Sequence, residues 1–229
     1  MKFKGLTISI PREIMAGERR VAAIPQTIEQ YVKEGAKVLV ETGAGKPAFF
    51  EDEDYRNAGA EIVSDPEELF QKADVIIKVK EPKYNDVVGK HEIEMFPENS
   101  VLISFLHPAN PANHEMVKML SNRGLTSFTL DSIPRISRAQ QMDTLTSMST
   151  VAGYKSVITA AYNLSKFIPM MPTSAGVIQP AQILVVGIGV AGLQALATAK
   201  RLGAKVKALD IRPDAMEQAR SLGAEVVPF

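Results

Sequence analysis

Two short stretches of the sequence hold side chains whose types and spacing could do chemistry. The first, PRISRAQQMDTLTS at residues 134–147, gathers two arginines, two glutamines and an aspartate but has no histidine, cysteine or lysine. It is either a catalytic loop without an obvious acid or base or a charged hinge between two domains. The second, GIGVAG at residues 187–192, fits the G-x-G-x-x-G pattern, which is typical of a dinucleotide-binding loop.

The three glycines of the second stretch have separate tasks in such a loop. Gly187 permits the tight turn out of a strand, Gly189 lets the backbone approach a pyrophosphate, and Gly192 lets the next helix pack closely on the sheet. A strand is expected at Ile183–Val186 and a helix at Leu193–Leu202, so that the helix N-terminus faces the phosphates. This order predicts a dinucleotide site, with a glycine-rich packing turn as the alternative.

An acidic residue completes the dinucleotide pattern. Asp210 follows a second expected strand, Lys205–Leu209, and comes 18 residues after Gly192. A carboxylate at that strand end accepts hydrogen bonds from the ribose hydroxyls of NAD and repels the 2′-phosphate of NADP. Asp210 therefore favours NAD, and the nearby Arg212 is expected to soften this preference.

The rest of the chain alternates between short apolar runs and amphipathic segments. The expected strands are Thr7–Ile10, Lys37–Glu41, Glu61–Val63, Asp74–Val79, Val101–Phe105 and Thr126–Leu130. The expected helices are Thr27–Glu34, Asp52–Ala58, Pro66–Ala73 and Pro111–Arg123. This alternation is typical of βαβ units and predicts an α/β fold with two parallel-sheet Rossmann-like domains joined by a long helix.

The long helix is expected at Thr144–Phe167, where apolar residues fall roughly on one stripe before Pro169 and Pro172. We divide the chain into an N-terminal αβα domain at 1–143, a connecting helix at 144–168 and the first part of an NAD-binding Rossmann domain at 169–229. Only two or three strands are expected in that last part, so the second domain is predicted to be truncated. The polar stretch would lie at the junction, a frequent place for ligand clefts.

Composition limits the classes of function. The 26 basic and 26 acidic residues cancel, which disfavours nucleic-acid binding, and the absence of cysteine excludes disulfides and thiolate metal sites. No metal site is predicted. The apolar run Ile183–Ala199 is 17 residues long and contains three glycines, whereas a membrane span needs about 20 continuous apolar residues. We expect a cytoplasmic location.

Several motifs together resemble one known family. PREIMAGERRVAAIP, VETGAGKPAFFEDEDYRNAGAEI, IIKVKEP, PRISRAQQMDTLTSMSTVAGYKSV and GIGVAGLQALATAKRLGAKV are similar to segments of the alanine dehydrogenase and pyridine-nucleotide transhydrogenase superfamily. The resemblance runs from about residue 8 to residue 223. The polar stretch and the glycine motif look specifically like those of the NAD(H)-binding alpha subunit of proton-translocating transhydrogenases.

The resemblance implies hydride transfer between NAD(H) on this chain and NADP(H) on a partner domain, coupled to proton movement through a membrane-spanning component. It also implies a homodimer, peripheral at the inner face of the membrane. Arg135, Gln140 and Asp143 would organise the nicotinamide end. The other implied NAD contacts are Ile136, Ser137, Arg138, Thr146, Gly187, Gly189, Val190, Ala191, Gly192, Asp210, Ile211 and Arg212.

Direct hydride transfer also accounts for the composition of the polar stretch. A hydride that moves from carbon to carbon requires no proton at oxygen or nitrogen, so no general acid or base is needed. Arginine, glutamine and aspartate can instead position a ring by hydrogen-bonding a carboxamide or ribose. The alternative is a solvated helix boundary, with Asp143 placed favourably at the helix start.

Two other functions stay open at the level of sequence. In an alanine dehydrogenase, which interconverts alanine with pyruvate and ammonia, Arg20, Lys80 and His107 resemble the pyruvate-binding and acid/base positions. The alternative for Lys80 and His107 is an ordinary surface lysine and a strand-end histidine held by Pro108. A catalytically silent NAD-binding fragment is the third reading.

Overall fold

The computed structural model describes residues 1–134 and 136–228, so Arg135 and Phe229 lie outside the described residues. The chain separates into two compact units, Met1–Pro134 and Arg135–Phe229. The polar stretch after Pro134 and the long helix therefore belong to the second unit. The division at residues 143 and 168 stays a prediction.

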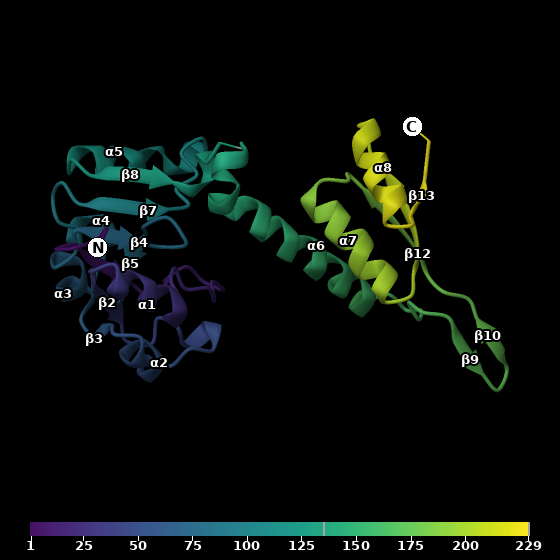
Figure 1. Ribbon diagram of the computed structural model, residues 1–229, viewed down its shortest axis with the longest axis horizontal. Helices are drawn as coiled ribbons and strands as arrows, with labels where there is room; N and C mark the ends of the chain where they lie inside the picture. Colours follow the sequence, from purple (N-terminus) through teal and green to yellow (C-terminus); the bar gives the residue numbers. More distant parts are fainter. Residues whose placement is uncertain (135, 229) are drawn as a thin grey trace. The chain divides into compact units, whose positions relative to one another are not determined.

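The first unit is built on a six-stranded sheet (Figure 1). Its strands are β1 Thr7–Ile10, β2 Lys37–Glu41, β3 Glu61–Val63, β4 Val75–Ile77, β7 Val101–Ser104 and β8 Thr126–Thr129. They lie in the order β3-β2-β1-β4-β7-β8, and all neighbours are parallel. Because the chain runs outward from β1 to β3 and then returns to β4, this is a doubly wound order that reverses between β1 and β4.

Helices cover both faces of this sheet. They are α1 Pro25–Lys33, α2 Asp52–Asn57, α3 Pro66–Gln71, α4 Glu92–Met95 and α5 His114–Asn122. Val38 packs with Ile28 of α1 and Tyr55 of α2, whereas Leu39, which points to the opposite face, packs with Leu69 of α3. Both faces of the central strands are thus buried, as expected for a parallel sheet.

Shorter elements complete the first unit. The antiparallel pair is β5 Tyr84–Asn85 and β6 Lys90–His91, and the 3-10 turns are η1 Lys46–Ala48, η2 Pro111–Asn113 and η3 Leu130–Ser132. His91 caps α4, since its Nδ1 accepts a hydrogen bond from the backbone N–H of Ile93.

The second unit contains a three-stranded parallel sheet. Its elements are η4 Ser137–Met142, α6 Thr144–Asn163, the hairpin β9 Met171–Thr173 and β10 Gly176–Ile178, β11 Gln182–Val186, α7 Val190–Arg201, β12 Lys205–Leu209, α8 Pro213–Ser221 and β13 Glu225–Val226. The strand order is β11-β12-β13, and α7 and α8 cover the same face (Figure 1). The core joins α6 to this layer, because Val157 packs with Leu196 of α7 and Ala208 of β12.

The predicted α/β class and the two parallel sheets are confirmed, and β1, β2, β3 and β12 have the predicted bounds. The long helix was predicted to reach Phe167 but ends at Asn163. The Asn163 side chain donates a hydrogen bond to the Thr159 carbonyl, and the next residue, Leu164, has an extended backbone. The polar side chain thus competes with the backbone hydrogen bonds of the helix, which ends before Pro169. Sequence patterns missed α4 and both hairpins, which are short, and also α8, which is as long as α1.

Candidate nucleotide-binding site

The loop between β11 and α7 has the geometry predicted for the glycine motif. Gly187 has φ of +88°, a conformation that L side chains rarely adopt, and its N–H donates to the Leu209 carbonyl at the end of β12. A Cβ on Gly192 would lie 2.0 Å from the Gly187 carbonyl oxygen. The strand, the turn and the first turn of α7 are therefore packed against one another through backbone atoms.

Space for a ligand opens beside Gly189. A Cβ added to Gly189 would meet no atom of the described chain within 4 Å. The next residues, Val190 and Ala191, begin α7, and the first N–H groups of a helix have no partner within it. Open space beside unsatisfied N–H groups and a helix N-terminus fits a pyrophosphate.

The Asp210 carboxylate lies at the end of β12 and is hydrogen-bonded to this loop. Its Oδ2 accepts the Ile188 N–H at 2.6 Å, and its Oδ1 accepts the Arg212 N–H at 2.9 Å. The Arg212 guanidinium also donates to both carboxylate oxygens and to the Ile188 carbonyl. These hydrogen bonds, from the Arg212 side chain first, hold the pKa of Asp210 well below its usual range, so the carboxylate is ionised.

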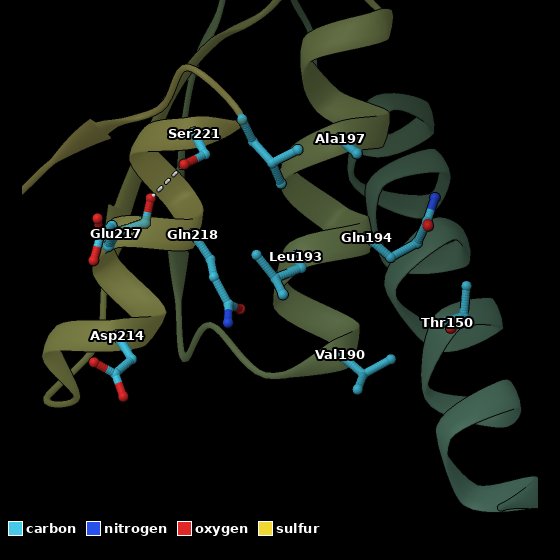
Figure 2. A pocket seen from close by; sticks show the side chains of 10 residues that line it. Thr150, Val190, Leu193, Gln194, Ala197, Asp214, Glu217, Gln218 and Ser221 are labelled. Atoms are coloured by element: carbon cyan, nitrogen blue, oxygen red, sulfur yellow. Dashed lines mark hydrogen bonds between the residues drawn. The ribbon is translucent and has the colours of Figure 1, made fainter. Parts of the chain in front are cut away.

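A hollow of about 190 Å³ lies at this corner, lined by Val186, Gly187, Leu209, Asp210 and Ile211. A larger groove of about 900 Å³ lies among α6, α7 and α8 (Figure 2). Its rim carries the carboxylates of Asp214 and Glu217 and no lysine or arginine among its lining residues. Only the smaller hollow is lined by Gly187 and Asp210, two residues of the predicted dinucleotide site.

The polar stretch forms the 3-10 turn η4 and then the N-cap of α6. Asp143 is that cap: its Oδ1 accepts the Thr146 N–H at 2.9 Å and its Oδ2 accepts the Thr146 hydroxyl at 2.6 Å. Asp143 and Thr146 thus have a structural role that sequence patterns foresaw only as a favourable charge. Whether they also touch a cofactor stays a prediction.

The remaining predicted residues of this stretch point outward. Ile136, Ser137, Arg138 and Gln140 are exposed, whereas Ala139 is buried. Arg135 lies outside the described residues. The second unit therefore contains both the glycine loop at residues 187–192 and an exposed polar turn at the start of α6.

The first unit has the strand order of a nucleotide-binding domain, but charged side chains of the protein itself lie where that order reverses. Ligands of such sheets bind at the carboxyl ends of the strands where the order reverses, here β1 and β4. Glu13 follows β1 and accepts the N–H groups of Val79 and Lys80 after β4. Lys78 Nζ lies 2.7 Å from Glu92 Oε1 and 3.9 Å from Glu13 Oε2, and all three side chains are at most 3% exposed.

This buried charge cluster, Glu13, Lys78 and Glu92, was not predicted. Burial lowers the pKa of Lys78, but the carboxylates of Glu92 and Glu13 outweigh it and raise the net pKa, so the ammonium stays charged. The Lys78 ammonium already lies at this edge of the sheet, and no G-x-G-x-x-G motif follows β1. The candidate nucleotide site is therefore in the second unit.

The three residues that resemble alanine dehydrogenase positions, Arg20, Lys80 and His107, have different environments. Arg20 forms a bidentate pair with Glu18 and thereby lowers the pKa of that carboxyl to about 2. Lys80 follows β4, and among the described residues its ammonium forms no ion pair. His107 follows β7 with φ of +47°, and its Nδ1 lies 2.7 Å from Asp131 Oδ1.

Asp131 holds the His107 imidazole. Its Oδ2 accepts the Thr129 hydroxyl and the N–H groups of Leu106 and His107. Burial raises the pKa of Asp131, yet these hydrogen bonds outweigh it and the net pKa is lowered. The ionised aspartate thus orients Nδ1 and leaves Nε2 for other partners, an arrangement suited to proton transfer. Sequence patterns singled out His107 but missed Asp131, which is close to it only in space.

Metal-binding clusters and membrane-spanning helices are both absent from the described residues. Within residues 1–134 and 136–228, no group of three or more histidine, aspartate or glutamate side chains is arranged to hold a metal ion. Over the same residues, no helix combines the length and apolar character needed to cross a bilayer, and Ile183–Ala199 is instead divided between β11 and α7.

Sequence comparison identifies two matching family domains. Residues 9–152 match the N-terminal domain, and residues 156–229 the C-terminal domain, of the family described as alanine dehydrogenase/PNT. The NAD(P) transhydrogenase subunit alpha of Cereibacter sphaeroides is 44% identical over 222 residues, covering 97% of this chain and 41% of that protein.

Alanine dehydrogenase of Bacillus subtilis is 35% identical over 218 residues, covering 93% of this chain and 54% of that protein. The chain therefore spans about half the length of these relatives. Among solved structures, transhydrogenase from Sinorhizobium meliloti superposes with a TM-score of 0.90 at 40% identity, covering 97% of this chain and 64% of that one.

Proposed function

The chain belongs to the alanine dehydrogenase/PNT family, and we propose that it is the NAD(H)-binding component of a proton-translocating NAD(P) transhydrogenase. One observation carries the proposal: a single compact unit combines a glycine loop at a helix N-terminus, an ionised aspartate after the next strand, and a polar turn with no histidine, cysteine or lysine. The greater identity to the transhydrogenase subunit than to the alanine dehydrogenase supports the same choice.

The residues of the second unit would have separate tasks. The N–H groups of Val190 to Gly192 donate to the pyrophosphate, and Asp210 accepts from the adenosine ribose once Arg212 has moved aside. Bound NADH supplies the hydride, which passes to NADP⁺ on a partner domain. Arg135, Gln140 and Asp143 hold the nicotinamide end in place and move no proton. The proposal includes a homodimer, peripheral at the inner face of the membrane through its membrane-spanning partner.

A direct assay tests this function. With NADH and thio-NADP⁺ as substrates, the chain reconstituted with its NADP(H)-binding and membrane components should reduce the thio-nucleotide, and neither part alone should do so. Gln140→Asn, which shortens an exposed side chain of the polar turn, should slow transfer about tenfold or more, since ring placement is the main requirement. Full transfer without the partner, or none with it, would overturn the proposal.

Alanine dehydrogenation is the second candidate, because Asp131 orients the His107 imidazole after β7. Lys80 follows the neighbouring strand β4 and forms no ion pair with the residues that the structure describes. In that reaction His107 would move the proton at nitrogen or oxygen, and Lys80 would bind the pyruvate carbonyl or carboxylate. Formation of NADH from NAD⁺ and L-alanine, lost on His107→Ala, would favour it. A chain that binds NADH but supports neither reaction would be a silent binding module.

Asp210 should set the preference between the two nucleotides. Asp210→Asn removes the negative charge that repels a 2′-phosphate and releases the Arg212 guanidinium, so the ratio of Kd for NADP⁺ to Kd for NAD⁺ should fall about tenfold or more. Calorimetric titration of both nucleotides measures the ratio. Asp214→Asn is the matched control, because this carboxylate lies in the larger groove. An unchanged ratio in Asp210→Asn would refute the role.

A further inference from the structure

Gly153 marks an unusually close contact between α6 and α7. It is one of two buried residues of α6, the other being Val157. A Cβ on Gly153 would lie 2.1 Å from the Ala191 carbonyl oxygen, 2.9 Å from the Ala191 carbonyl carbon and 3.0 Å from Gln194 Cβ. Since two of these atoms are backbone, a side-chain rotation cannot relieve the clash.

The residue that Gly153 touches belongs to the phosphate loop. Ala191 is the second residue of α7, and its neighbour Gly192 packs on the Gly187 carbonyl oxygen on the other side. The first turn of α7 is therefore held between β11 and α6. Thr150 of α6 and Gln194 of α7 both line the larger groove (Figure 2).

The same helix carries the polar turn. Asp143 caps α6 ten residues before Gly153, a separation of about 15 Å at the rise of an α-helix. Because α6 is continuous from Thr144 to Asn163, its contact with Ala191 fixes how far the polar turn lies from the phosphate loop. A ligand that touches both depends on this spacing.

Helix propensity argues against a role for Gly153 within α6 alone. Glycine in the middle of a helix is less favourable than alanine, so alanine would stabilise the helix if the site had room. The contact with Ala191 reverses that gain. Of the two helices α7 is the better held, since Leu196 and Ala199 pack with strand β12, so α6 is the one that shifts.

We propose that Gly153 is a positioning residue of the NAD(H) site, which sets the distance between the polar turn at residues 136–143 and the phosphate loop at residues 187–192. This inference rests on the proposed function. It predicts that a side chain at position 153 disturbs ligands that span both elements and spares those that reach the phosphate loop alone.

Calorimetric titration of the full chain with NADH and with ADP-ribose tests the proposal, because ADP-ribose lacks the nicotinamide. Gly153→Ala should raise the Kd of NADH about tenfold or more and that of ADP-ribose about twofold or less. Thr159→Ala, at an exposed position of α6, should change neither. If Gly153→Ala does not fold, Val157→Ala loosens the same face of α6 without a clash. It should again raise the Kd of NADH more than the Kd of ADP-ribose, by a smaller factor.

The outcomes separate the inference from the function beneath it. An equal loss for both ligands, or no loss for either, in folded Gly153→Ala or Val157→Ala would overturn the positioning role. A failure of the unsubstituted chain to bind NADH would overturn the proposed function, and this inference with it.

Discussion

Gly192→Ala is expected to abolish tight NADH binding, raising Kd at least about a hundredfold. The added Cβ would lie 2.0 Å from the Gly187 carbonyl oxygen, so the loop and the first turn of α7 must separate. The N–H groups of this turn then no longer point toward the pyrophosphate. Two lost hydrogen bonds to a charged group, at about 1.5–3 kcal/mol each, correspond to such a loss of affinity.

Gly189→Ala provides a contrast within the same loop. Its Cβ meets no atom of the described chain within 4 Å, and its backbone, with φ of −86°, is accessible to alanine. The thermal stability of the ligand-free protein should therefore stay unchanged, while NADH binding is weakened because the methyl group fills the path of the pyrophosphate. Gly192→Ala should lower both the thermal stability and the affinity for NADH. Normal NADH affinity in either variant would place the nucleotide elsewhere.

The glycine loop could be predicted from the sequence because its determinants are local. Gly187, Gly189, Gly192 and Asp210 lie within one βαβ unit. Residue type alone reveals the backbone freedom of the glycines and the charge of the aspartate. The same holds for β1, β2 and β3, whose β-branched runs are bounded by clear turns. Where local pattern and tertiary packing agree, the expected element forms.

Other features of the chain depend on contacts that no local pattern encodes. Glu13 accepts the N–H of a residue 66 positions away, and IIKVK looks like an ordinary strand edge until Glu92 is brought beside Lys78. Gly153 resembles a weak position in a helix, and only its contact with Ala191 explains it. Asp131 is distinguished from other acidic residues by the imidazole it reaches. These roles arise from long-range packing.

Lys78→Met should be the most destabilising single substitution in the first unit. Methionine fits the volume of the lysine stem but leaves the Glu92 and Glu13 carboxylates buried without a cation. Breaking a buried pair by removing one partner costs about 3–5 kcal/mol, a large share of the stability of a domain. Urea unfolding followed by circular dichroism should show this loss in the transition of the first unit.

Two further variants show whether the lost charge or the changed shape of the side chain causes the loss of stability in Lys78→Met. Lys72→Met makes the same substitution in the exposed pair with Glu68 and should leave the unfolding midpoint unchanged. Lys78→Met combined with Glu92→Gln removes the second charge but keeps an acceptor for the Lys83 N–H, so it should recover a large part of the loss. If the double variant were as unstable as the sum of the two single variants, the cost would come from packing, and the cluster would contribute no pairing energy to this sheet.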